Sequence, residues 1–297
     1  MSSNSTFSTY HPIINFGFFC GVIGIGMFLM HPVFLAVGMA ASMIYALMLG
    51  GKGTLKFFLC FLVPVVLLII VLNPLFNHRG DTILFYLGNS YVTLEAIAYG
   101  MCIAFMLASV LMWFSCYNRI ITSDKLVYLF GRIMPAISLI FSMVMRFVPN
   151  YRMQIKRISD AQKCIGRDVS NGTVKQRAHH GIKIISVMFT WTLENAIDTA
   201  DSMRSRGYGL KDRTTFSIYR FDRRDAAAGI VLIAASLVVI IGAALGKCSI
   251  EFYPNIVMTD MDAFGIAVYA AYFILCFFPI VVEVKEVLTW RLMQSRI

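Results

Sequence analysis

The feature that most restricts how this chain can fold is a series of long apolar stretches along its whole length. About 20 residues of helix cross the hydrocarbon core of a bilayer, and several stretches reach that length. Their approximate ranges are 13–30, 32–49, 57–76, 94–116, 226–246 and 262–283. The sequence therefore predicts an all-α, polytopic membrane protein with about six transmembrane helices.

Composition argues against the alternative of a soluble helical protein. Of the 297 residues, 58% are hydrophobic and 14% are charged. Soluble domains carry about a quarter charged residues, because their surfaces must stay hydrated. A soluble chain of this length would need a more polar surface even around a large core, so we expect this chain to lie in a membrane.

The beginning of the chain does not resemble a cleavable signal peptide. Its first residues, MSSNSTFSTYHP, contain no lysine or arginine, whereas a signal peptide starts with a positively charged region. We expect the first apolar stretch to be a membrane helix. It contains Gly21, Gly24 and Gly26, and small residues allow neighbouring helices to approach closely.

Cysteine and histidine are the residues that a disulfide framework or a metal site would need. The seven cysteines form no Cys-x-x-Cys pair and mostly lie inside apolar stretches, so we expect them to be small buried side chains. His11 and His31 each precede a proline, and proline favours the first turn of a helix. We therefore interpret the two His-Pro pairs as helix starts, and we predict no metal site and no cofactor.

The distribution of charge predicts which side of the membrane each loop faces, because positively charged loops stay in the cytoplasm. Residues 146–224 contain sixteen lysines and arginines against seven acidic residues, and the loop at 50–56 carries two lysines. The loop at 247–262 has one lysine against three acids. We therefore place the first two segments and both termini in the cytoplasm and the third segment outside. The arginines flank membrane helices, so nucleic acid is not an expected partner.

These assignments divide the chain into an N-terminal membrane domain at 1–119 with about four spans, a cytoplasmic domain at 120–225, and a C-terminal membrane domain at 226–297 with about two spans. A further apolar stretch, 126–148, is long enough to cross the membrane, but a crossing there would place the basic segment outside. We therefore predict that it is helical, lies at the cytoplasmic face without spanning, and is capped by the Thr-Ser-Asp sequence at 122–124.

Two amphipathic helices are predicted in the cytoplasmic domain. The first, at 151–168, places four basic side chains within about 60° of one another, opposite an apolar side. The sequence Ser-Asn-Gly-Thr at 170–173 breaks it. The second helix, at 174–206, has one apolar face and an acidic stripe. The stripe consists of Glu194, Asp198 and Asp201. It is explained either by a solvated surface or by a docking surface.

Two segments of this domain resemble the transmembrane T component of energy-coupling factor (ECF) transporters, a family that includes the membrane subunit of cobalt and nickel importers. The segments read MRFVPNYRMQIKRISDAQKCIGRD and SVMFTWTLENAIDTADSMRSRGYG. The family pattern has Arg-Phe-x-Pro before the first helix, Ala-Gln-x-Ala-Arg-Gly at its end, and Met-x-x-Arg-Gly-Tyr at the end of the second helix. The matching positions that support these coupling helices are Arg146, Pro149, Ala161, Gln162 and Met203.

The resemblance implies a non-catalytic scaffold subunit in a bacterial or archaeal cell membrane. Two cytoplasmic ABC-type ATPase subunits would dock on the ends of the two helices, and a separate membrane subunit would bind the substrate, a vitamin or a transition metal ion. The residues implied in ATPase coupling are Cys164, Ile165, Gly166 and Arg167 at the first end and Ser205, Arg206 and Gly207 at the second.

At the second end, each residue type suits this role. Gly207 can end the helix in the left-handed conformation. Arg206 offers a rigid, always-charged group to an acidic groove on a partner. An ordinary helix end is the alternative interpretation of the same two residues.

The first helix end departs from the family pattern, because Ile165 stands where the family has arginine. Arg167 follows the glycine, but each residue along a helix turns the side chain by about 100°. The second end keeps the pattern, with Ser205 in place of alanine. The resemblance therefore implies one contact of the family's usual kind and one altered contact.

Two other function classes remain open, a self-sufficient secondary transporter and a polytopic membrane enzyme. An enzyme needs polar groups that converge at one site, and secondary transporters often show inverted repeats and ionisable residues within the membrane. The predicted spans are nearly free of charge, and the two halves of the chain do not match. The fragment GGKGT at 50–54 lacks the Gly-Lys-Ser/Thr of a nucleotide-binding P-loop, so ATP hydrolysis is expected in a partner.

Overall fold

The computed structural model describes residues 5–87, 90–167, 169–208, 219–254, 256–258 and 262–294. The chain separates into two compact units. The first, which we call the membrane unit, contains the residues up to Leu126 and those from Tyr219 onward. The second, the helix-pair unit, contains the residues between Val127 and Ile218.

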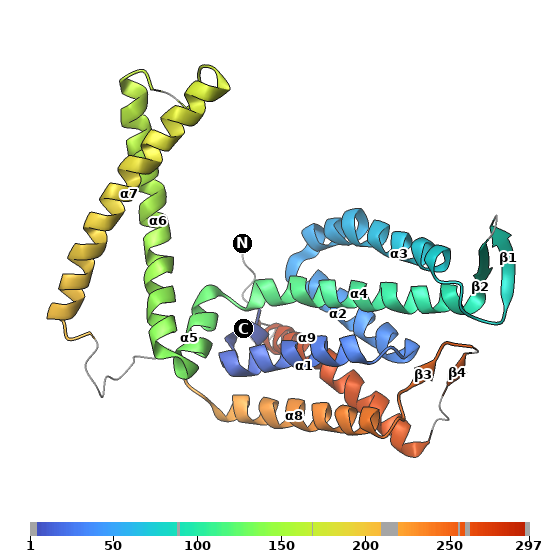
Figure 1. Cartoon of the computed structure of the whole chain (residues 1–297). Coiled ribbons are helices and arrows are strands. Elements are labelled where there is room, and N and C mark those ends of the chain that lie inside the picture. The colour runs from blue at the N-terminus through green and yellow to red at the C-terminus, as the bar shows by residue number, and fades with distance from the viewer. Residues whose placement is uncertain are drawn as a thin grey trace. The chain divides into compact units, whose positions relative to one another are not determined.

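Helices make up nearly all of the regular structure among these residues (Figure 1). The membrane unit holds α1 (Pro12–Phe28), α2 (Pro32–Phe57), α3 (Val63–Phe76), α4 (Leu94–Ile120), α8 (Arg223–Ala244) and α9 (Ala263–Gln294). A short α5 (Ser123–Ile133) leads to the long helices α6 (Pro135–Cys164) and α7 (Val174–Ser205). Two small antiparallel hairpins pair β1 (Ile83–Leu87) with β2 (Ser90–Thr93) and β3 (Ile250–Glu251) with β4 (Val257–Met258).

Four helical segments of the described chain are long and apolar enough to cross a membrane. They are Pro32–Phe76, Leu94–Ile120, Arg223–Ala244 and Ala263–Gln294. The 17-residue helix α1 is apolar but shorter. Each of the six predicted apolar stretches coincides with part of a helix, so the predicted all-α, multi-pass membrane fold is confirmed. The number of crossings stays a prediction.

The 45-residue segment Pro32–Phe76 is divided at Gly51. The backbone there has φ 49° and ψ −131°, a conformation that glycine adopts far more readily than other residues. The break allows α2 and α3 both to pack against α4, as Figure 1 shows. The predicted loop at 50–56 is therefore a bend with helical residues on both sides.

Both His-Pro pairs start helices, as predicted. Nδ1 of His11 accepts a hydrogen bond from the N–H of Ile13 at 3.3 Å, and Nδ1 of His31 accepts one from Val33 at 3.3 Å. The following proline occupies the first turn in each case. Helix capping thus explains both histidines. In the described part of the chain, no three His, Cys, Asp or Glu side chains lie together as a metal site would need.

Aromatic side chains form the core of the membrane unit. Trp113 on α4 is fully buried, and its ring meets that of Phe18 edge-on, with 5.5 Å between centroids. Phe7 contacts Phe18 in the same way at 5.3 Å. Beside this core, the buried ammonium of Lys125 donates to the backbone carbonyl of Ser8 at 2.6 Å, and burial lowers the pKa of Lys125 to about 8. These contacts fix the segment before α1 against the end of α4.

The helices α8 and α9 approach each other tightly at Gly242. A Cβ atom at that position would lie 2.4 Å from Cγ2 of Val268, far inside the usual separation of non-bonded carbon atoms. The glycines of α1 have more room, because a Cβ at Gly21 or Gly26 would meet its nearest neighbour at 3.6 or 3.8 Å, and one at Gly24 would meet nothing within 4 Å. The tight approach therefore lies between α8 and α9 rather than at α1.

The predicted boundary at Pro149 is wrong. We predicted one helix over 126–148 and a second that begins after Pro149, but the chain breaks at Met134 and α6 runs through Pro149. Pro135 takes the first-turn position that proline favours. Pro149 removes one backbone donor and crowds the carbonyl four residues earlier. Phe147 and Tyr151 on either side of it face α7, and this packing offsets the cost. The stretch 126–148 contains none of the membrane-length apolar helices of the described chain.

The predicted C-terminal ends of the two coupling helices are residues 168 and 206. The helix α7 covers Val174–Ser205, close to its predicted range. The helix α6 ends at Cys164, before the predicted end at 168, and residue 168 itself lies outside the described residues. Parts of the predicted outside loop, 255 and 259–261, and of both termini also lie outside them.

Candidate functional site

The helix α6 ends in a closed turn that positions the first set of predicted contact residues. Gly166 has a φ of 77°. Its N–H donates to the carbonyl of Lys163 at 3.0 Å, and the N–H of Arg167 donates to the carbonyl of Gln162 at 2.9 Å. Together these bonds form a Schellman motif, which satisfies the last carbonyls of a helix while glycine adopts the left-handed conformation.

The helix α7 ends in the same way. Gly207 has a φ of 74°. Its N–H donates to the carbonyl of Arg204 at 3.1 Å, and the N–H of Tyr208 donates to the carbonyl of Met203 at 3.1 Å. The prediction that Gly207 stops this helix in the left-handed conformation is confirmed.

Because the two turns share one hydrogen-bond pattern, they can be aligned residue by residue. The equivalent pairs are Gln162 with Met203, Cys164 with Ser205, Ile165 with Arg206, Gly166 with Gly207, and Arg167 with Tyr208. Ile165 and Arg206 are both C-cap residues with similar backbone angles. Ile165 thus occupies the structural position of Arg206, while Arg167 occupies a different one.

The side chains at the two C-caps are exposed. Ile165 keeps 61% of its surface accessible, and Arg206 is also exposed. A single exposed isoleucine is ordinary on a protein surface, and at this position it would suit an apolar partner surface. An arginine in the same geometry suits an acidic one. The two ends therefore present the same shape with different chemistry.

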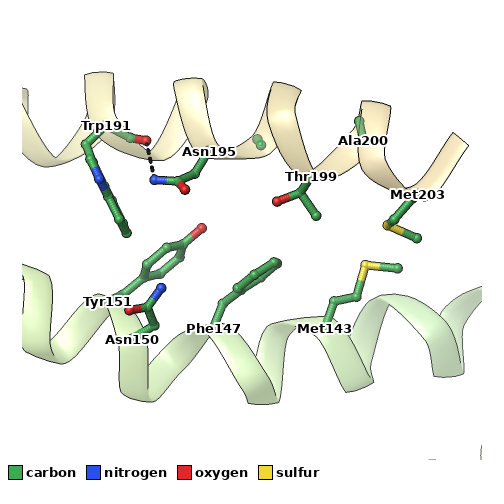
Figure 2. Close-up of a pocket in the computed structure, with 10 residues that line it drawn as sticks. Met143, Phe147, Asn150, Tyr151, Trp191, Asn195, Thr199, Ala200 and Met203 are labelled. Atoms are coloured by element: carbon green, nitrogen blue, oxygen red, sulfur yellow. Dashed lines mark hydrogen bonds between the residues drawn. The ribbon is translucent and has the colours of Figure 1, made fainter. Parts of the chain in front are cut away.

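The two ends lie on opposite sides of a contact between α6 and α7. The rings of Tyr151 and Trp191 meet edge-on with 5.7 Å between centroids. The helices run in opposite directions, as the labelled residues in Figure 2 show. At the usual rise of an α-helix, the contact lies about 20 Å from the end of α6 and about 21 Å from the end of α7. Because α6 and α7 cross at an angle (Figure 1), the two ends are at most about 40 Å apart.

A cleft of about 260 Å³ opens between the helices, on the side of this contact that leads to the C-terminal end of α7. Figure 2 shows Met143 and Phe147 of α6 facing Thr199 and Met203 of α7 across it. The Phe147 ring also stacks on Tyr151, at 5.8 Å and 14°. Beyond the aromatic contact the helices are thus separated by a gap rather than by a packed core.

The predicted support residues fall into two groups. Met203 lines the cleft, and its carbonyl also closes the end of α7. Gln162 has the equivalent closing role in α6. The remaining three lie exposed on α6, so the structure does not bring them together with the cleft; they are Arg146, Pro149 and Ala161.

The helix α7 also carries an exposed apolar stripe, with residues spaced three or four positions apart. Its members are Ile182 (66% exposed), Ile185 (68%), Phe189 (65%), Leu193 (53%) and Ile197 (64%). A continuous apolar surface of this kind usually marks an interaction site. The acidic stripe of the same helix, predicted from Glu194, Asp198 and Asp201, is exposed as well.

Sequence reasoning found this stripe but missed the aromatic contact between α6 and α7. Tyr151 and Trp191 stand near the start of one predicted helix and the middle of the other. Their type signals a packing role, because large aromatic side chains dominate contacts between helices. The pattern within each helix does not say which residue of the other helix they meet.

Comparison with known proteins gives an independent view of the chain. The family model described as "Cobalt transport protein", CbiQ, matches residues 17–216. The "Energy-coupling factor transporter transmembrane protein EcfT" of Lacticaseibacillus paracasei is 32% identical over 109 residues, which cover 36% of this chain and 41% of that protein. The protein of the same description from Streptococcus equi is 30% identical over 180 residues, 57% of this chain and 66% of that protein.

A longer alignment joins the chain to the EcfT protein of Listeria innocua, which is 28% identical over 211 residues, 67% of this chain and 79% of that protein. For the first three curated relatives, the matched part spans only 41%, 32% and 40% of their length. The similarity is thus strongest over part of each protein.

Proposed function

Because this chain belongs to the CbiQ family of cobalt transport proteins, whose model covers residues 17–216, we propose that it is the transmembrane scaffold subunit of an energy-coupling factor importer. It holds two cytoplasmic ABC-type ATPase subunits and a separate substrate-binding membrane subunit. The imported substrate is a vitamin or a transition metal ion, and the partner membrane subunit binds it. The chain itself passes movement from the ATPases to that partner.

The observation that carries this proposal is the pair of equivalent helix ends. Each end is closed by a glycine and exposes the C-cap side chain before it, Ile165 or Arg206. Two related ATPase subunits offer two related surfaces, and a chain with two similar protrusions can engage both. The two ends lie on opposite sides of the contact between the helices, up to about 40 Å apart, which leaves room for one subunit at each.

The helix pair then acts as the moving element. ATP binding and hydrolysis change the spacing of the two ATPase subunits and so displace the two helix ends. The contact between Tyr151 and Trp191 holds the helices together while their ends move. The exposed apolar stripe of α7 provides the surface through which this movement reaches the substrate-binding subunit.

Purification of the native complex tests the proposal. An affinity tag on this chain is expected to recover two ATPase subunits and one further membrane protein, and vesicles that contain the complex are expected to take up substrate only with ATP. Uptake by this chain alone, driven by an ion gradient, would instead support a secondary transporter.

The altered first end gives a separate prediction. Ile165→Arg is expected to weaken ATPase association at that end about tenfold or more, because a partner surface that accommodates isoleucine would have to bury a charge without a counterion. Ile165→Leu keeps an apolar side chain and is expected to bind as the unmodified chain does. Stronger association of Ile165→Arg in quantitative co-purification would show that the partner surface is acidic, and unchanged association would show that residue 165 does not contact the ATPase.

A further inference from the structure

A groove on the membrane unit has no part in the transport role proposed above. It encloses about 640 Å³ between α8, α9 and the segment before α1. Its apolar lining includes Val231 and Phe278, and its charged lining consists of Arg224, Lys285 and Glu286. The groove therefore combines an oily part with a net charge of +1.

Val231 and Phe278 lie farther along the helices than the charged groups, while Trp290 and Met293 continue the lining of α9 past Lys285. On α8, Arg224 precedes Val231 by seven residues, and on α9, Lys285 follows Phe278 by seven residues. Seven residues correspond to about 10 Å along a helix axis. The two helices pack together as consecutive segments, so the charged groups of both lie at the end where the basic segment of the chain meets α8. The charge distribution predicts that this end faces the cytoplasm.

The guanidinium of Arg224 is held in a defined position. It lies 4.3 Å above the ring of Tyr10, and its Nη2 donates to Oγ1 of Thr9 at 3.2 Å. That bond engages one of its five N–H donors, and a phosphate group takes up two parallel ones. Arg224 is therefore held at the groove and carries N–H donors beyond the one that Thr9 accepts.

We propose that this groove binds an anionic phospholipid with one net negative charge, of which phosphatidylglycerol is the type. Its phosphodiester lies between Arg224 and Lys285, and its acyl chains lie along Val231 and Phe278. Basic pockets between membrane helices on the cytoplasmic side favour acidic head groups in this way. Glu286 limits the net charge of the lining, so a lipid with a single negative charge is the better complement than one with several.

Three single substitutions in the full chain test the site, each measured as binding of phosphatidylglycerol by native mass spectrometry from detergent. Lys285→Gln is expected to weaken binding about fivefold, the usual contribution of one basic residue near an anionic head group. Glu286→Gln is expected to strengthen it by a similar factor. The control Arg291→Gln, on the last turn of α9 but outside the groove lining, is expected to leave binding unchanged.

The same measurement separates the lipid from other ligands. Phosphatidylcholine is expected to bind more weakly than phosphatidylglycerol, and glycerophosphoglycerol, which has the phosphodiester head group without acyl chains, is expected not to compete. Equal binding of the two lipids, competition by glycerophosphoglycerol, or an equal effect of Lys285→Gln and Arg291→Gln would each overturn the proposal. Should Lys285→Gln fail to fold, the gain expected from Glu286→Gln still decides it.

Discussion

Replacement of Arg206 by glutamate is expected to release one ATPase subunit and to lower ATP-dependent uptake at least tenfold. Arg206 is the exposed C-cap residue of α7, and we propose that its guanidinium enters an acidic groove of the ATPase. A carboxylate in that groove would meet like charges, and juxtaposed like charges cost several kcal/mol. Each 1.4 kcal/mol is about a tenfold loss of affinity. Co-purification of the ATPase subunits with the tagged variant, followed by uptake in vesicles, provides the measurement.

A matched control lies two residues away. Arg204 is also exposed in the last turn of α7, but two residues turn the side chain by about 200° around the helix. Arg204→Glu makes the same change of charge and is expected to keep both ATPase subunits. Arg206→Lys is expected to be intermediate, because lysine keeps the charge but lacks the planar fork of arginine. Equal losses in Arg204→Glu and Arg206→Glu would contradict a specific role for Arg206.

Introduction of a single methyl group at Gly242 is expected to destabilise the membrane unit strongly. The Cβ of Gly242→Ala would lie 2.4 and 2.9 Å from the two methyl carbons of Val268, so α8 and α9 would have to move apart. Overpacking of this kind typically costs about 1–3 kcal/mol. We expect a lower temperature of thermal unfolding for the purified protein in detergent.

Two further variants identify the cause of that loss. Val268→Ala removes the methyl groups that would clash, so the double variant with Gly242→Ala is expected to recover much of the lost stability. Gly24→Ala adds the same methyl group to a membrane helix where nothing lies within 4 Å, and it is expected to leave the unfolding temperature unchanged or higher. A loss in Gly24→Ala as large as in Gly242→Ala would mean that the tight approach of α8 and α9 is not the reason.

Much of the membrane unit could be predicted from the sequence because length and apolarity are local properties. Each apolar stretch became a helix, and the His-Pro pairs marked two helix starts. The family resemblance, based on the segments MRFVPNYRMQIKRISDAQKCIGRD and SVMFTWTLENAIDTADSMRSRGYG, is confirmed by the match to the cobalt transport protein family and by relatives described as ECF transmembrane proteins. The close approach at Gly242 could not be predicted, because it depends on which face α9 turns toward α8.

In the coupling helices too, the features that depend on contacts between helices could not be predicted from the sequence. Gly207 signalled the end of α7 through its own conformational freedom, and the structure confirms it. Pro149 signalled a helix start that does not exist, because contacts of Phe147 and Tyr151 in the helix pair outweigh the local preference of one proline. The roles of Ile165 and Arg206 in ATPase docking stay predictions, since they concern contacts with other chains.

The position of the aromatic contact between α6 and α7 has a mechanical consequence. Along α6, Tyr151 lies about 24 Å from the start of the helix and about 20 Å from its end. Along α7, Trp191 lies about 26 Å from the start and about 21 Å from the end. If both helices turn about this contact as rigid rods, each is a lever whose two arms have a length ratio of about 1.2. Because the docking arm is the shorter one, both levers carry a displacement at the docking end to the opposite end enlarged about 1.2-fold. An equal push on the two ends is therefore transmitted equally, although the side chains that receive it are an isoleucine and an arginine.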